Sequence, residues 1–98
     1  MSLKDRITDD MKAAMRARES GRLGTLRLLL AAIKQKEVDE RITVDDAQVL
    51  AIIEKLIKQR RDSIEQFQRA GRQDLVDTEQ AELAVLDAYR PEQAGDAE

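Results

Sequence analysis

Acidic side chains at close spacing are the residues of this sequence that could do acid–base or metal chemistry. Glu79 and Glu82 lie three residues apart, and Asp45 and Asp46 are adjacent, so each pair could offer two carboxylates to a substrate or a metal ion. The 98-residue chain contains no His and no Cys, which removes the His general base and the zinc sites built from Cys or His. Helix surfaces bring carboxylates together by chance, so we predict no catalytic residue, no metal and no cofactor.

Two adjacent arginines, Arg60 and Arg61, lie in a segment whose apolar residues repeat with helical spacing. Ile57 precedes Arg60 by three residues and another isoleucine follows it by four, which places Arg60 on the apolar face of a helix. We therefore predict that Arg60 is structural and pairs with an acid of the last helix, either Glu79 or Glu82. A functional pocket or an exposed edge is the alternative. Arg61 is rotated by about 100° from Arg60 about the helix axis, so its side chain should be available to a partner.

Other cations could join Arg61 in a basic surface for a phosphate backbone. With Arg61 included, the candidate residues of this surface are Arg27, Lys34, Lys58, Arg61, Arg69 and Arg72. The charge distribution allows such a surface, because residues 1–73 contain 16 Lys/Arg and 12 Asp/Glu, whereas residues 74–98 contain one Arg and eight acids. The alternative is an ordinary solvated surface, in which acids four residues away form local ion pairs with these cations.

Four amphipathic helices are predicted to position these residues, since no segment alternates with the period of a strand. The helices are expected from an N-cap at Ser2 to about residue 18, from about 22 into the charged segment 34–42, from about 44 to 70, and from about 74 to 89. The predicted fold is an all-α domain over residues 1–91, a compact bundle of about four helices with mostly antiparallel neighbours. Residues 92–98 contain too little apolar surface to order and are predicted to be a disordered tail.

Capping residues and glycines should set the helix ends. Thr43 is predicted to cap the third helix, and Gly21 and Gly71 to adopt the left-handed conformation that ends the first and third helices. Gly24 stands inside a helix, where it costs about 1 kcal/mol relative to Ala, so we expect close helix packing there.

The apolar stripes predict the core. Leu28 and Ala31 widen the stripe of the second helix, which is therefore expected to be the most buried. The core is predicted to contain Leu26, Leu30, Ile33, Leu50, Ile53, Ile57, Ile64 and Leu86.

The N-terminal sequence and the hydropathy predict a location. The first ten residues, MSLKDRITDD, carry acids and no apolar run, unlike a secretory signal peptide. No stretch approaches the roughly 18 apolar residues of a membrane span. We therefore predict a cytoplasmic protein.

Three segments, taken together and in order, resemble a known family. They are RLGTLRLLLAAIKQKEVDER, IIEKLIKQRRDSIEQFQRAGRQDL and EQAELAVLDAYRPEQ, and they resemble the YqeY-like family over about residues 1–93. That family is similar to the C-terminal tail of one subunit of the bacterial glutamine-dependent Asp/Glu-tRNA amidotransferase. The resemblance implies an N-terminal helical domain, normally followed by a second small helical domain.

The chain departs from the family pattern near its end. The family usually has a YLP motif and then continues into its second domain. Here the sequence reads Tyr89, Arg90, Pro91, and seven further residues follow. We therefore expect the second domain to be absent from this chain.

The resemblance also implies a function. In the amidotransferase the related tail contacts tRNA, similar domains are appended to some glutaminyl-tRNA synthetases, and the transamidation chemistry belongs to other domains. A carbon–nitrogen ligase label would thus be inherited by association. We expect a non-catalytic accessory module of tRNA metabolism that binds tRNA or a tRNA-dependent amidotransferase or synthetase. The alternative is a protein-interaction or self-association module without direct RNA contact.

Overall fold

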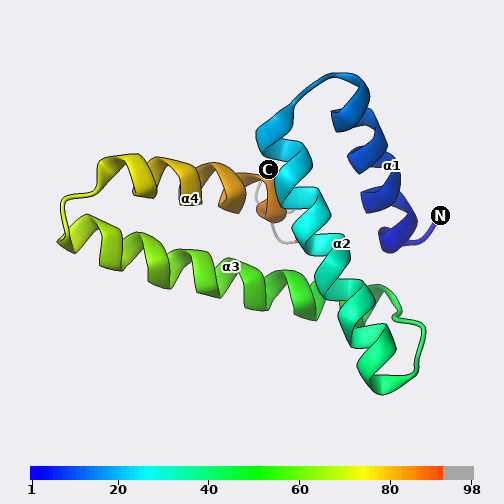
Figure 1. Cartoon of the computed structure of the whole chain (residues 1–98). Helices are drawn as coiled ribbons and strands as arrows, with labels where there is room; N and C mark the ends of the chain where they lie inside the picture. Colours follow the sequence, from blue (N-terminus) through cyan, green and yellow to red (C-terminus); the bar gives the residue numbers. More distant parts are fainter. Residues whose placement is uncertain (92–98) are drawn as a thin grey trace. The chain divides into compact units, whose positions relative to one another are not determined.

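The computed structural model describes residues 1–91, which form four α-helices and no strand (Figure 1). The helices are α1 (Leu3–Arg16), α2 (Ser20–Glu40), α3 (Asp46–Arg69) and α4 (Gln73–Asp87). The predicted all-α class with four helices is confirmed, and the observed helix ends lie within two residues of the expected positions. Among the described residues, no helix combines the length and the apolar character needed to cross a membrane.

The contacts divide the chain into two compact units, with the boundary inside α3. The N-terminal unit, Met1–Ile52, contains α1, α2 and the first turns of α3. Within it α1 packs along α2 and runs antiparallel to it (Figure 1). The C-terminal unit begins at Ile53 and contains the rest of α3 and α4, which turns back after residues 70–72 (Figure 1). The expected tail, residues 92–98, lies outside the described residues, and the single domain over residues 1–91 stays a prediction.

The helix ends depend on local hydrogen bonds. The Ser2 hydroxyl accepts a hydrogen bond from the backbone N–H of Asp5 at 3.1 Å, so Ser2 caps α1 as predicted. The predicted role of Gly21 is wrong, because Gly21 lies inside α2 and Arg18 takes the left-handed conformation, with φ 59°. The chain turns three residues earlier than expected, where the Arg18 N–H bonds to the Met15 carbonyl.

The start of α3 also differs from the expectation. Asp45 Oδ1 accepts a hydrogen bond from the Gln48 N–H at 2.8 Å, and Gln48 Oε1 accepts one from the Asp45 N–H at 3.0 Å. This reciprocal pair is a capping box. The prediction of Thr43 as the cap is wrong, since Thr43 lies two residues too early for its hydroxyl to take this role.

The two remaining glycine predictions have opposite outcomes. Gly71 has φ 70° and follows the last turn of α3, which confirms it as the residue that ends that helix. A Cβ added at Gly24 would meet nothing within 4 Å. The expectation of close packing at Gly24 is therefore wrong, and its position on the exposed side of α2 is the reason.

The core follows the predicted helical faces with a small rotation. Five of the predicted residues are fully buried, namely Leu26, Ile33, Ile53, Ile57 and Leu86. Leu30, Leu50 and Ile64 are only partly buried, so their assignment to the core is wrong. Leu29 and Val49 are fully buried instead, because the buried faces of α2 and of the start of α3 are turned by less than one residue step of 100° from the predicted faces.

Candidate binding surface

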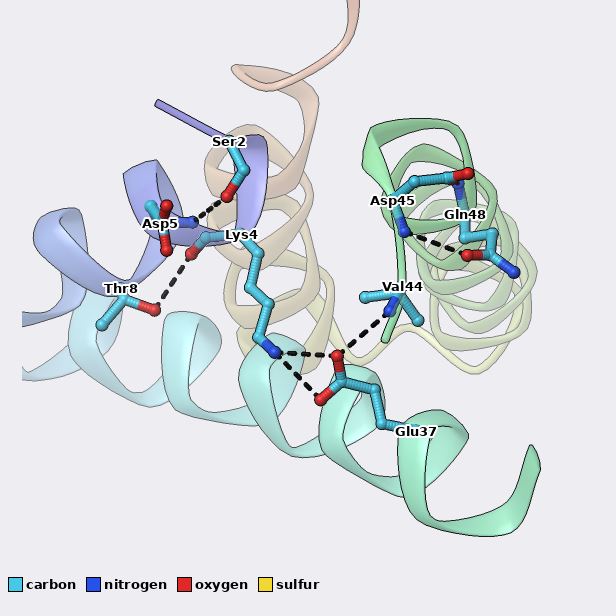
Figure 2. Close-up of polar contacts among 8 residues, drawn as sticks. All are labelled: Ser2, Lys4, Asp5, Thr8, Glu37, Val44, Asp45 and Gln48. Carbon is cyan, nitrogen blue, oxygen red and sulfur yellow. Dashed lines mark hydrogen bonds and ion pairs between the residues drawn. The ribbon is translucent and has the colours of Figure 1, made fainter. Parts of the chain in front are cut away.

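An ion pair fixes α2 in the N-terminal unit (Figure 2). Lys4 Nζ donates to both carboxylate oxygens of Glu37, at 2.9 and 2.8 Å, and Glu37 Oε2 also accepts from the Val44 N–H at 3.1 Å. The Leu3 N–H adds a bond to Asp46 Oδ1 at 2.9 Å. The first turn of α1 is thereby tied to the last turns of α2 and to the segment that enters α3.

The same contacts keep the Glu37 carboxylate charged. Its side chain is only 12% exposed. The hydrogen bond from Lys4 lowers the pKa of Glu37 most, the Val44 N–H lowers it further, and burial opposes both. No pattern in the sequence predicted this ion pair, because its partners are 33 residues apart and their contact depends on the packing of α1 on α2.

The cations of α2 fall into two groups. Arg27 and Lys34 are exposed, and within residues 1–91 neither side chain makes a hydrogen bond or an ion pair, although the charge of Lys34 helps to lower the pKa of Glu37. In contrast, Arg22 pairs with Glu19 at 3.6 Å, and Lys36 pairs with the carboxylate four residues later at 2.9 Å. Both of the cations predicted on this helix are therefore available to a partner.

Apolar residues lie on the exposed side of the same helix. We call this surface the outer face of α2, and it consists of Gly24, Leu28, Ala31, Gln35 and Val38. Leu28 is 41% exposed and Val38 is 59% exposed. The expectation that Leu28 and Ala31 widen a buried stripe is wrong. Periodicity finds apolar positions on a helix, but it does not show which of them meet another helix.

The four cations predicted on and after α3 also differ in their surroundings. Lys58 and Arg61 are exposed, and within the described part of the chain they make no hydrogen bond or ion pair. Arg69 pairs with the carboxylate four residues before it. Arg72 makes two hydrogen bonds to Asp74, at 3.2 and 3.0 Å, which raise the pKa of Arg72 and lower that of Asp74. Pairing with an acid four residues away, the alternative left open by the sequence, thus describes Arg69, whereas Arg72 pairs with an acid two residues later.

Arg60 belongs to α3, and its side chain reaches Glu82 of α4. Its Nε is 3.2 Å from Glu82 Oε1, and the two side chains are 12% and 31% exposed. A weaker bond, at 3.5 Å, joins the guanidinium to the Leu56 carbonyl. Glu79 makes no bond to Arg60; burial and then the charge of Glu82 raise the pKa of Glu79, while the charge of Arg60 opposes this. The Arg60 side chain is therefore held by contacts within the protein.

A second bridge between the two helices was not predicted from the sequence. Arg90, just after α4, pairs with Glu54 of α3 at 2.7 Å and with Asp87 at 2.9 Å. The preceding residue, Tyr89, is buried. A cation after a helix C-terminus is favoured by the helix dipole, but the Glu54 partner becomes visible only when α4 is placed against α3.

The carboxylate pairs have structural partners as well. Asp45 caps α3, and Asp46 accepts the Leu3 N–H. Glu82 is paired with Arg60. Within residues 1–91 no three Asp or Glu side chains are grouped as they would be around a metal ion. The exposed cations and the outer face of α2 are therefore the candidates for contact with a partner that the following proposals use.

Comparison with known proteins gives the family. The family described as Yqey-like protein matches residues 4–98. The chain belongs to the YqeY-like family. The resemblance found in the three sequence segments is thereby confirmed.

Three of the curated proteins similar to this YqeY-like chain come from fungi. One is the protein named "Altered inheritance of mitochondria protein 41, mitochondrial" of Eremothecium gossypii, which is 43% identical to this chain over 84 residues. The matched region covers 85% of this chain and 46% of that protein. The protein of the same name from Lachancea thermotolerans is 41% identical over 84 residues, which cover 85% of this chain and 45% of that protein. The protein named "Uncharacterized protein C22F3.15" of Schizosaccharomyces pombe is 31% identical over 92 residues, which cover 94% of this chain and 72% of that protein. The YqeY-like chain thus spans about half the length of the first two relatives.

These relatives correct the predicted location. The proteins from Eremothecium gossypii, Lachancea thermotolerans and Kluyveromyces lactis carry names that place them in mitochondria. The prediction of a cytoplasmic protein is therefore wrong. Targeting is read from separate segments, so the charge and hydropathy of a helical domain do not distinguish one aqueous compartment from another.

Proposed function

We propose that this chain is a non-catalytic accessory module of tRNA metabolism that binds tRNA through its phosphates. The observation that carries the proposal is that Lys58 and Arg61 are exposed and, within residues 1–91, free of hydrogen bonds and ion pairs. The resemblance of the family to the tail of an amidotransferase subunit supplies the class of ligand. Catalysis is assigned to the enzyme with which such a module works.

Phosphate contact is the mode of binding that these side chains favour. Lys and Arg that neutralise phosphates release counterions, and this gives affinity that falls with salt and depends little on sequence. Base stacking has little support, because the chain contains one Phe, one Tyr and no Trp, and Tyr89 is buried. The proposed binding is therefore weak and tolerant of tRNA identity.

The test compares two pairs of cations that carry the same charge. Lys58→Ala with Arg61→Ala removes two unpaired cations, whereas Arg69→Ala with Arg72→Ala removes two that already pair with acids. The binding of labelled tRNA is measured by fluorescence anisotropy over a salt series. The first double variant should lower the slope of log K against log salt by about two units, and the second by clearly less.

Two results would count against the proposal. One is no tRNA binding by the parent chain at low salt. The other is an equal change of slope in the two double variants, which would mean that only net charge matters. A competition with double-stranded DNA of the same length would then measure how much of the binding is unspecific.

A second candidate function is protein interaction without RNA contact. It is favoured by the outer face of α2, where Leu28 and Val38 expose apolar surface. The partner would then be a protein of the tRNA machinery, such as an amidotransferase or a synthetase. Co-purification with and without ribonuclease separates the two candidates, since a protein partner is retained after RNA is digested.

A further inference from the structure

The outer face of α2 has the spacing of one half of a helix–helix interface. Its residues, Gly24, Leu28, Ala31, Gln35 and Val38, follow one another at alternating steps of four and three. This is the a/d pattern of a heptad repeat, which keeps one seam facing a partner helix. All five residues are exposed, and the open space around Gly24 would let a second helix approach closely.

A row of three cations runs beside this seam. Arg27, Lys34 and Arg41 are spaced by seven residues, which places them on one flank about 10 Å apart. They occupy the g positions of the heptad, the flank from which coiled coils choose their partners by charge. Within residues 1–91 none of the three side chains makes a hydrogen bond or an ion pair.

Arg41 is the last cation of the row. It is exposed and ends α2 with φ 55°, in the left-handed conformation that is common after the last turn of a helix. The row therefore reaches from Arg27 to the C-terminal end of α2.

We propose that the outer face of α2 docks an amphipathic helix of a partner protein whose apolar seam is flanked by carboxylates. The apolar residues of that helix would cover Leu28 and Val38, and its Asp or Glu side chains would pair with the cation row of Arg27, Lys34 and Arg41. This inference rests on the second candidate function, protein interaction, and it specifies the chemistry of the partner.

A second copy of the chain fits this face poorly. If two copies of α2 paired antiparallel, like flanks would meet and the cation row would face itself. In a parallel pair the row would face the residues at positions 25, 32 and 39, of which only Asp39 is acidic, and Asp39 already accepts a hydrogen bond from Gln35. RNA also fits poorly, because a phosphate backbone would leave Leu28 and Val38 in contact with water or with charge.

The test uses the full chain and two designed three-heptad peptides. Both peptides carry Leu at the a and d positions; one has Glu at the e and g positions and the other has Lys. Binding is measured by anisotropy of the labelled peptides. The parent should bind the Glu peptide at least about tenfold more tightly than the Lys peptide, as expected for three surface ion pairs replaced by like-charge contacts.

Charge reversal is the central variant. Arg27→Glu with Lys34→Glu should reverse the preference, so that the chain binds the Lys peptide. Lys58→Glu with Arg61→Glu makes the same change of charge on α3 and should leave the preference unchanged. Circular dichroism checks that each variant is folded. Equal binding of both peptides by the parent, or the same reversal by the α3 variant, would overturn the proposal.

An apolar variant tests the seam without changing charge. Leu28→Ser with Val38→Ser removes the exposed apolar side chains of the outer face and should weaken binding of the Glu peptide about tenfold, while tRNA binding stays unchanged. If tRNA binding falls with it, RNA occupies this face and the helix proposal is wrong. A dimer in sedimentation that this double variant dissociates would assign the face to a second copy and also overturn it. Loss of tRNA binding in the α3 variant alone leaves the helix proposal intact.

Discussion

Arg60 and Arg61 are neighbours whose side chains meet different surroundings. Arg60 is 12% exposed and lies 3.2 Å from Glu82, whereas Arg61 is exposed and, within residues 1–91, without an ion pair. The difference follows from the 100° rotation between adjacent helical residues. At the scale of single residues, the helical phase therefore separates an internal cation from one that can meet a partner.

The first prediction concerns the stability of the two arginine variants. Arg60→Ala should lower the free energy of unfolding by about 1–3 kcal/mol, because it removes a charged hydrogen bond and the packing of the aliphatic stem. Arg61→Ala should change it by less than about 0.5 kcal/mol. Urea unfolding of both variants against the parent gives the two values. Equal losses would show that both arginines have the same role.

The second prediction is the pH dependence caused by Glu37. Its pKa is lowered in the folded chain by Lys4 and then by the Val44 N–H, so the unfolded chain binds the proton more tightly. The stabilisation is therefore full above the ordinary glutamate pKa of about 4.3. It is lost as the pH falls through the lower folded-state pKa. The urea midpoint, measured from pH 7 to pH 3, should fall.

Two variants control this measurement. Glu37→Gln should unfold more easily at pH 7 and should lose part of the decline between pH 5 and 3. Glu79→Gln should not lose that decline, because burial and the charge of Glu82 raise the pKa of Glu79 and its contribution instead diminishes as the pH rises. A decline that is the same in Glu37→Gln and in the parent would exclude Glu37 as its cause.

At the scale of the helices, the glycines show how local conformation and surroundings combine. Gly24 lies within α2 with open space around it, and Gly71 lies after α3 with a positive φ. A helix interior favours alanine over glycine, whereas the left-handed conformation favours glycine. The same substitution should therefore have opposite effects at the two positions.

The third prediction follows from this contrast. Gly24→Ala should raise the free energy of unfolding by about 0.5–1 kcal/mol, since the new methyl group meets no other atom. Gly71→Ala should lower it by about 1 kcal/mol. Thermal and urea unfolding measure both. A destabilising Gly24→Ala would mean that something contacts this position in solution, and the outer face of α2 would no longer be open.

At the scale of the whole molecule, pairs of distant residues hold the helices of each unit together. Lys4 and Glu37 do so in the N-terminal unit, and Arg90 and Glu54 in the C-terminal unit. Each pair joins the end of one helix to a different helix. Pairs four residues apart, such as Arg69 with Glu65, add little to tertiary structure.

The fourth prediction compares a distant pair with a local pair. Arg90→Ala should lower the free energy of unfolding by about 1–2 kcal/mol, because it removes the ion pair with Glu54 and the hydrogen bond to Asp87 from a side chain that is largely buried. Arg69→Ala should cost less than about 0.5 kcal/mol, as is usual for an exposed helical pair. Chemical denaturation of both variants measures the two losses of stability, and a larger loss for Arg69→Ala than for Arg90→Ala would contradict the prediction.

Local sequence was enough to specify the helices and the family. Helix ends depend on residues within one turn, such as Ser2 at the start of α1 and Gly71 after α3, so periodicity and capping rules placed the four helices. The exposed cations on the helix surfaces could be named for the same reason. The three family segments are likewise a property of the chain order alone.

Helix packing selects which side of each helix is covered and which distant residues meet. Leu29 rather than Leu30 is buried, Glu82 rather than Glu79 pairs with Arg60, and the outer face of α2 stays exposed. The repeat of 3.6 residues defines the faces of a helix, but a rotation of less than one residue step is enough to bury Leu29 in place of Leu30. Contacts between distant residues form only when two helices pack, so the periodicity of one helix does not show which residue of another helix it meets.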